Sequence, residues 1–180
     1  MQVGLVESDR DLEAIIALQR ASRAPTKDGF VTVEHSLDIL RTMHAIAPSV
    51  VARDPHGEVI AYALVMPKET RTLLPILEPM FQMIEQFAPK LGVSPSSRWY
   101  VMGQIAVAPS HRGTGVFDAL YAKHRTRYQS RFDVVVTEVA TRNPRSLRAH
   151  ERVGFHTVTT YRDATDDWIL LAWDWGHSVL

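Results

Sequence analysis

The sequence of 180 residues contains no cysteine, which excludes disulfide bonds, thiolate zinc sites and cysteine nucleophiles. It has no excess of one charge either, because twenty lysines and arginines balance twenty aspartates and glutamates. A nucleic-acid partner usually requires a clustered basic excess. The longest apolar stretch, residues 59–67, is far shorter than the ~20 residues that span a bilayer. We therefore expect neither a nucleic acid nor a membrane as a partner.

The beginning of the chain lacks the basic region and apolar core of a secretory signal peptide. Together with the absence of cysteine, this favours a cytoplasmic protein. The length of 180 residues is typical of one domain, and an apolar fraction of 46% is ordinary for a globular protein. We therefore expect residues 1–180 to form a single domain.

The apolar pattern predicts a mixed α/β chain. Strands are expected at residues 2–6, 49–53, 58–66, 98–107, 133–139, 155–162 and 168–175. Helices are expected from Ser8 or Asp9, from about Glu34, over 116–128 and over 143–153. Residues 24–29 should end the first helix, and residues 70–91 should be mostly helical with a break at Pro75 or Pro79. This order is typical of a mixed sheet and not of a regular alternation of strands and helices.

The segment 112–117, Arg-Gly-Thr-Gly-Val-Phe, joins a predicted strand to a predicted helix. The first N–H groups of a helix lack internal partners and the helix dipole is positive there, so this end attracts a phosphate. Gly113 and Gly115 allow close approach of the backbone, and Arg112 adds a positive fork. A dinucleotide fingerprint needs glycine where Asp118 stands, and the Gly-Lys-Ser/Thr of a P-loop is missing. Two interpretations of the segment remain. It binds another phosphate ligand, or it is a tight turn in which the glycines serve only the backbone geometry.

A second motif follows the predicted strand at 133–139: Asn143-Pro-Arg-Ser146-Leu-Arg-Ala-His150-Glu-Arg-Val-Gly154-Phe155. With the segment 112–117, it makes the stretch from about residue 98 to about residue 175 resemble the GNAT N-acetyltransferase superfamily. The resemblance implies a single-domain α/β (α+β) fold with a mixed central sheet of about seven strands. That sheet would be splayed between strands 4 and 5 and flanked by helices, with a helical insert at residues 67–97.

The resemblance also implies acetyl-CoA as a co-substrate, lying between the fourth and fifth strands. Backbone groups of the fourth strand would pair with the pantetheine arm, here at Ile105, Ala106 and Val107. The pyrophosphate would lie on backbone groups of Arg112, Gly113, Thr114, Gly115, Val116 and Phe117. Asn143 would contact the cofactor, with Ser146 nearby. Two positions depart from the family, which prefers glycine or alanine in place of Phe117 and a neutral or basic residue in place of Asp118.

Many family members carry a tyrosine at the position of His150, which lies seven residues after Asn143 on the same helical face. One interpretation of His150 is the general acid for the leaving thiolate, and the alternative is a residue that packs under the cofactor. Glu138 is unusual in an apolar strand. It is a candidate general base, and the alternatives are a polar residue with a structural partner, a solvated strand end, or deprotonation through water.

We expect an N-acetyltransferase that moves an acetyl group directly from acetyl-CoA to a primary amine of a small molecule or peptide. The alternatives are a CoA-binding sensor or interaction module without catalysis, and an acyltransferase with a longer acyl donor. The eight histidines are scattered without a His-Glu-x-x-His motif, so no metal is expected. The acceptor site should involve residues 22–47 and the insert at 67–97. The apolar face of the insert would cover that site, its own domain, or a second subunit of a homodimer.

Overall fold

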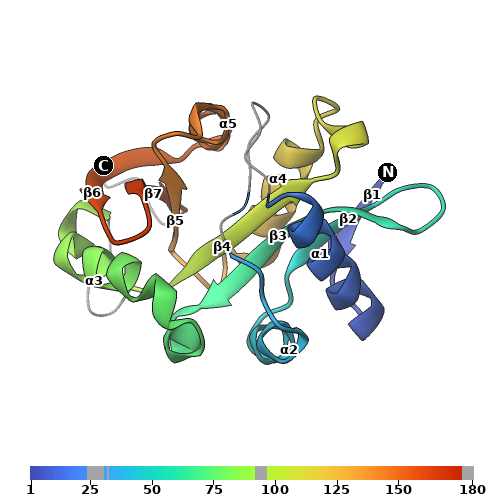
Figure 1. Ribbon diagram of the computed structural model, residues 1–180, viewed down its shortest axis with the longest axis horizontal. Coiled ribbons are helices and arrows are strands. Elements are labelled where there is room, and N and C mark those ends of the chain that lie inside the picture. Colours follow the sequence, from blue (N-terminus) through green and yellow to red (C-terminus); the bar gives the residue numbers. More distant parts are fainter. Residues whose placement is uncertain (24–30, 32, 92–96, 176–180) are drawn as a thin grey trace. The chain divides into compact units, whose positions relative to one another are not determined.

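The computed structural model of the protein describes residues 1–23, 31, 33–91 and 97–175. The predicted break at 24–29 lies outside these residues. The chain divides into two compact units, each built from two stretches of sequence. The first unit comprises Met1–Met66 and Met102–Thr126, and the second comprises Pro67–Val101 and Arg127–Leu180. Figure 1 labels the helices and strands of both units.

Among the described residues, seven strands form one sheet in the order β1-β2-β3-β4-β5-β7-β6. They are β1 Gln2–Leu5, β2 Val50–Arg53, β3 Val59–Pro67, β4 Trp99–Val107, β5 Val134–Ala140, β6 His156–Arg162 and β7 Asp167–Asp174. The β4–β5 pair is parallel, whereas the β1–β2, β2–β3, β5–β7 and β6–β7 pairs are antiparallel. The predicted mixed sheet is confirmed, and every strand begins within one residue of its predicted start.

The α-helices of the described residues are α1 Asp9–Ala21, α2 Leu37–Ile46, α3 Glu78–Gln86, α4 Val116–Tyr128 and α5 Pro144–Val153. The 3-10 helices are η1 Lys68–Leu73, η2 Pro75–Leu77, η3 Ala88–Leu91 and η4 Pro109–His111. The predicted start of α2 near Glu34 is too early. Ser36 caps the helix, because its Oγ accepts a hydrogen bond from the Ile39 amide at 3.3 Å, so the helical turns begin at Leu37.

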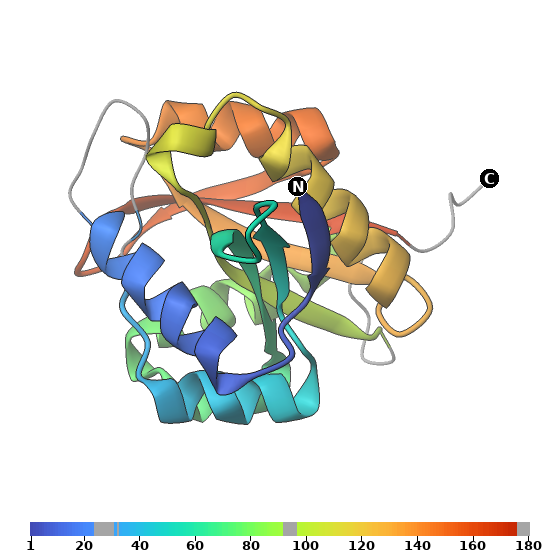
Figure 2. The same ribbon diagram turned by 90° about the vertical axis from the view of Figure 1, so that its right-hand side faces the viewer.

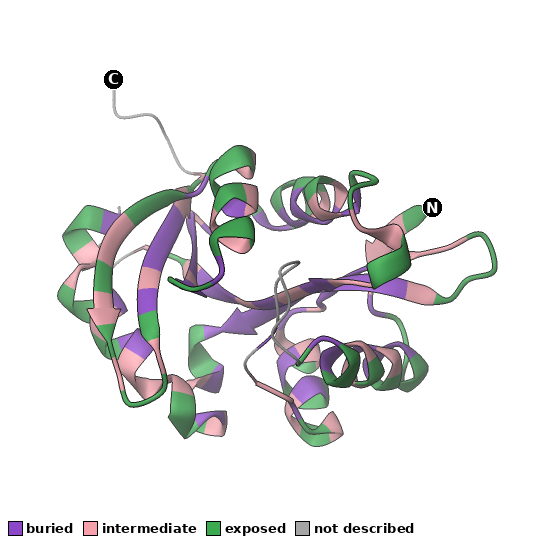
Figure 3. Ribbon diagram, turned by 45° about the horizontal axis from the view of Figure 1, so that its top comes forward, coloured by how far each residue is buried: buried purple, intermediate pink, exposed green. Residues whose placement is uncertain are grey.

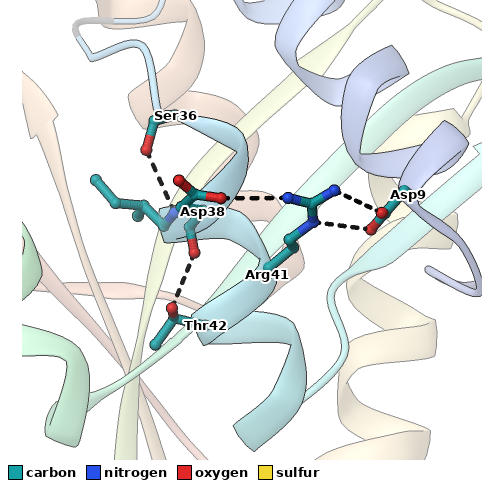
Figure 4. Close-up of polar contacts among 6 residues, drawn as sticks. Asp9, Ser36, Asp38, Arg41 and Thr42 are labelled. Carbon is teal, nitrogen blue, oxygen red and sulfur yellow. Dashed lines mark hydrogen bonds and ion pairs between the residues drawn. The ribbon is translucent and has the colours of Figure 1, made fainter.

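In the first unit, α1 and α2 contact each other (Figure 2). Arg41 of α2 donates hydrogen bonds of 3.2 and 2.7 Å to the two carboxylate oxygens of Asp9, the first residue of α1 (Figure 4). It also reaches Asp38 one turn earlier, at 3.2 Å. All three side chains are exposed, so this network adds little to the free energy of unfolding. The bidentate pair links the first residue of α1 to α2.

A buried polar network connects the segment before α2 to β3 and β4 within the first unit. The Gln19 side chain accepts from the His35 amide at 2.8 Å and contacts His35 Nδ1 at 3.0 Å. The Tyr62 hydroxyl donates to Gln104 Oε1 at 2.5 Å, and Gln104 Nε2 donates to the Val33 carbonyl at 2.7 Å. Burial lowers the pKa of His35 to about 4, so its imidazole is neutral at physiological pH. The network fixes Gln104, the residue before the predicted pantetheine contacts.

In the second unit, the parallel pairing joins Trp99–Val101 of β4 to residues 134–136 of β5, the first three residues of each strand. β5 then pairs with β7 along its whole length. Six of the seven residues of β5 are buried, whereas β6, at the edge of the sheet, is largely exposed or half-buried (Figure 3). Tyr100, Tyr128, Phe132 and Trp175 gather in an aromatic cluster with ring centroids 4.8 to 5.9 Å from Tyr100.

The predicted helical insert is confirmed over its described residues, where η1, η2, α3 and η3 follow one another. Pro75 begins η2 and Pro79 lies in the first turn of α3, which explains why the segment is broken into short pieces. Arg71 donates to Glu78 and Glu85, with distances of 2.5 to 2.8 Å. Phe81 of α3 packs against Trp99 with ring centroids 6.2 Å apart. The insert is thus attached to β4 by an aromatic contact.

Gly154 ends α5, as predicted, and its backbone requires glycine. Its φ is +122°, and an added Cβ would lie 2.6 Å from Trp173 Nε1.

We expect Gly154→Ala to lower the free energy of unfolding by about 3 kcal/mol, from a strained backbone and a clash. Gly57→Ala is the matched control, because Gly57 has a φ of +85° with open space around the added Cβ. Gly57→Ala should lower the free energy of unfolding by about 1 kcal/mol. Equal losses in the two variants, measured by urea unfolding, would contradict the clash with Trp173.

Candidate functional site

The segment 112–117, the glycine loop, follows η4 in the first unit and includes the first two residues of α4. Gly113 and Gly115 have φ values of +77° and +82°, which explains why both positions are glycine. The Gly115 carbonyl accepts from the Ala119 amide at 3.1 Å, so α4 begins directly after this residue. The Thr114 hydroxyl donates to the His111 carbonyl at 2.7 Å. The predicted loop-to-helix junction is therefore present.

The glycine loop has space for an anion beside its backbone. A Cβ added at Gly113 or at Gly115 would meet no atom within 4 Å, and both glycines and Thr114 are exposed. Helix geometry leaves the first N–H groups of α4 without partners inside the helix, at the positive end of its dipole. Arg112 Nε donates to the Val107 carbonyl at 3.1 Å, which holds this cation at the loop. These features fit a phosphate.

Phe117, which departs from the family pattern, has a side-chain contact within α4. Its ring packs on Tyr121 one turn later, with ring centroids 5.1 Å apart, and Tyr121 is buried. The bulky side chain therefore lies along the helix. Asp118 is exposed in the first turn of α4, where a negative charge favours helix formation but opposes a bound phosphate.

The last residues of β4 lead into the glycine loop. Ala106 is buried, whereas Ile105 and Val107 are half-buried, so the three residues alternate along the strand. Immediately after the strand, the Ala108 amide donates to the Ile60 carbonyl at 2.8 Å. This bond and the bond from Arg112 to Val107 fix the end of the strand.

The second predicted group, Asn143, Ser146 and His150, lies on α5 in the second unit. Asn143 is the N-cap, and its Oδ1 accepts from the Ser146 amide at 3.3 Å. His150 is 1% exposed, and its Nδ1 lies 2.8 Å from the Ser146 carbonyl oxygen. A carbonyl oxygen only accepts, so Nδ1 carries the proton of this bond. Burial lowers the pKa of His150 to about 4, and the neutral imidazole then bears its lone pair on Nε2.

Glu138 lies on β5 of the second unit and has a structural partner. The Tyr161 hydroxyl on β6 donates a short hydrogen bond to Glu138 Oε2. Burial raises the pKa of Glu138 to about 7, the Tyr161 hydrogen bond opposes this rise, and the negative charge of Asp163 adds to it. A carboxyl group that titrates near neutral pH is suited to general base catalysis. Its ionisation is therefore set by its burial, by Tyr161 of β6 and by Asp163, which follows β6.

Tyr161 is absent from the residues predicted from the sequence. Its contact with Glu138 joins residues 23 positions apart, and β7 lies between their strands in the sheet. The isolated acidic residue Glu138 in an apolar strand indicated that it has a polar partner. The sequence did not identify that partner as Tyr161. The capping role of Asn143 was likewise not predicted, although asparagine before a proline and a helix is a typical N-cap signal.

Within the described part of the chain, histidine, aspartate and glutamate side chains form no group of three or more that could hold a metal ion. Among the same residues, no helix combines the length and the apolar character needed to cross a bilayer.

Several solved structures are similar to this chain over nearly its full length. The ribosomal-protein-S18-alanine N-acetyltransferase of Escherichia coli has a TM-score of 0.67 at 16% identity, covering 98% of this chain and 95% of that chain. A GNAT superfamily phosphinothricin acetyltransferase of Sinorhizobium meliloti, in complex with AcCoA, has a TM-score of 0.65 at 19% identity, covering 97% and 89%. Chaetomium thermophilum Naa20, in complex with a bisubstrate analogue, has a TM-score of 0.68 at 16% identity, covering 97% and 86%. At these identities the likeness shows a shared fold.

The family follows from the sequence itself. A sequence model described as the acetyltransferase (GNAT) family matches residues 15–155, which is well over half of the chain. No curated protein sequence matches. The chain belongs to the acetyltransferase (GNAT) family, and the fold and the enzyme class, an acyltransferase, that we predicted are confirmed.

Proposed function

We propose that residues 1–180 act as one cytoplasmic N-acetyltransferase domain that moves an acetyl group from acetyl-CoA to a primary amine. The glycine loop is the observation that carries this proposal. It combines two left-handed glycines with open space beside them, the start of a 13-residue helix, and a cation held by the end of β4. Family membership makes the pyrophosphate of acetyl-CoA the anion that this loop fits best.

We assign the remaining cofactor contacts by the family's pattern. Backbone groups of Ile105, Ala106 and Val107 would bind the pantetheine arm, and those of the glycine loop would bind the pyrophosphate. Asn143 and Ser146, at the start of α5, would contribute further contacts. The N-cap bond between these two residues supports this assignment, because it fixes the first turn of α5.

Glu138 is the proposed general base. Its carboxylate, or a water molecule bound to it, takes a proton from the acceptor ammonium, and the neutral amine nitrogen then attacks the thioester carbonyl carbon. A C–N bond forms as the C–S bond breaks, and the CoA thiolate leaves and takes up a proton. A pKa of about 7 means that the base is half ionised near neutral pH, which supports this role.

His150 has two proposed roles, and the structure supplies a reason to distinguish them. As a general acid it would have to deliver a proton to the thiolate from Nε2. Its neutral tautomer instead places the proton on Nδ1, toward the Ser146 carbonyl. The low pKa of about 4 also makes the imidazolium rare at neutral pH. These observations favour the packing role of His150 over the acid role.

His150→Phe tests these two roles. The phenyl ring preserves the volume and the edge-on contact with Phe155, whose ring centroid lies 5.3 Å away. We expect kcat at pH 7.5 to stay within about threefold of the wild-type value, with a lower Tm because the bond to Ser146 is lost. A loss of kcat of roughly 100-fold with unchanged CoA binding would assign the acid role instead.

The acceptor is proposed as a primary amine of a small molecule or a peptide. The similar solved proteins are named for a ribosomal-protein alanine and for phosphinothricin, which supports an amine acceptor without choosing between the two classes. A thiol-release assay with acetyl-CoA and a panel of polyamines, amino acids and peptides tests the proposal. Turnover above hydrolysis with any amine supports transfer, and tight CoA binding without such turnover would favour a non-catalytic CoA-binding module.

A further inference from the structure

Glu138 and Tyr161 come from strands that do not pair with each other. In the sheet order, β7 lies between β5 and β6. Glu138 pairs with Leu170 of β7, and Leu170 pairs with Thr159 of β6. Residues opposite each other in a sheet share a face, and so do residues two positions apart in a strand. Tyr161 therefore stands on the same face as Glu138 and reaches it across β7.

This geometry explains why a tyrosine makes the contact. Adjacent strands lie about 4.8 Å apart, so β5 and β6 are separated by roughly 10 Å. Tyr161 sits diagonally from Thr159, the residue in line with Glu138, and it combines the reach for this distance with a hydroxyl donor. Its own pKa is raised by burial and by the charge of Glu138, so the hydroxyl keeps its proton at neutral pH and donates to Oε2.

We propose that Tyr161 is a positioning residue for Glu138: by donating to Oε2 it holds the carboxylate in its ionised form, and Oε1 takes the proton of the acceptor amine. This inference rests on the proposed function, in which Glu138 is the base. Among the residues that the structure describes, Tyr161 is the hydrogen-bond partner of Glu138. A carboxylate held at one oxygen keeps the other oxygen for a second partner.

The hydrogen bond has an electrostatic consequence as well. Burial raises the pKa of Glu138 to about 7, the Tyr161 hydroxyl lowers it, and Asp163 raises it. Asp163 belongs to the turn after β6, where its carboxylate accepts from the amides of Thr165 and Asp166 at 2.7 and 3.0 Å. The neighbour of Glu138 on β7, Leu170, carries no charge. Within the described chain, Tyr161 is thus the group that favours ionisation of Glu138.

Tyr161→Phe tests the inference, because it removes the hydroxyl and keeps the ring. The carboxyl carbon of Glu138 is titrated by 13C NMR in the ligand-free protein, with no substrate needed. We expect its midpoint to move to higher pH. In thiol release with the amine that gives turnover, kcat/KM at pH 6.5 should fall roughly tenfold, while the value at pH 9 stays within about twofold. Tyr128→Phe, which loses a hydroxyl from the aromatic cluster of the same unit, is the control and should leave both readouts unchanged.

The outcomes separate this inference from the proposed function. An unchanged or lowered Glu138 midpoint in Tyr161→Phe would overturn the positioning role, and so would an equal loss of kcat/KM at both pH values. Failure of the base role has a different signature, namely full activity in Glu138→Gln. In that case the NMR titration still decides whether Tyr161 controls the ionisation of Glu138.

Discussion

Replacement of Gly115 by tryptophan is expected to weaken CoA binding about 100-fold. The side chain would occupy the open space beside the glycine loop, where the pyrophosphate is proposed to lie. Charge-assisted hydrogen bonds contribute about 1.5 to 3 kcal/mol each, and about 2.7 kcal/mol corresponds to 100-fold in Kd. Isothermal titration of CoA into the variant and the wild-type protein measures the change.

Gly57→Trp is the matched control for this experiment. Gly57 has a φ of +85°, close to the +82° of Gly115, and an added Cβ at either position meets no atom within 4 Å. Gly57 lies in the turn between β2 and β3. Both variants therefore carry a similar backbone strain, and only Gly115→Trp should lose CoA affinity. Equal affinities in the two variants would contradict our placement of the pyrophosphate.

The second large effect is expected for Glu138→Gln. The amide still accepts the hydrogen bond from Tyr161 but takes up no proton, so kcat at pH 8 should fall about 100-fold. CoA affinity should stay within about twofold of the wild-type value. Glu151→Gln makes the same chemical change at an exposed position of α5 and should leave kcat unchanged.

The pH dependence gives the same prediction a second readout. The pKa of Glu138 is raised to about 7, and the ionised form is the base. In the wild-type protein, kcat/KM should therefore rise as the pH increases through about 7. Glu138→Gln should remove this rise. A wild-type profile that is flat between pH 6 and 8, or a variant profile that keeps the rise, would exclude Glu138 as the base.

The glycine loop was predictable because its signals are local. Two glycines, an arginine and the start of an apolar helical pattern lie within a few residues, and the backbone angles at Gly113 and Gly115 explain the choice of glycine. The strand starts were predictable for a similar reason, since turn residues and prolines border the apolar runs. The start of α2 was misplaced, because the capping bond of Ser36 outweighed the helical spacing of the residues before it.

The groups that set the chemistry of Glu138 were less predictable. Its neighbour Tyr161 depends on the insertion of β7 between β5 and β6, and the sequence does not specify that order. The tautomer of His150 depends on a bond to the Ser146 carbonyl within α5, a detail that helical spacing permits but does not require. The residues with unusual chemistry could therefore be predicted from the sequence, whereas the sheet order and the hydrogen bonds determine how they ionise.

The most direct test of acetyl transfer follows the acetyl group itself. Acetyl-CoA with a 13C-labelled acetyl group is incubated with the protein and each amine of the panel, and the products are analysed by mass spectrometry. We predict that at least one amine gains the label as an amide, with one free thiol released per amide. This product should be strongly reduced with Gly115→Trp and retained with Gly57→Trp. Binding of acetyl-CoA without a labelled amide from any amine would contradict the proposal that this chain is an N-acetyltransferase.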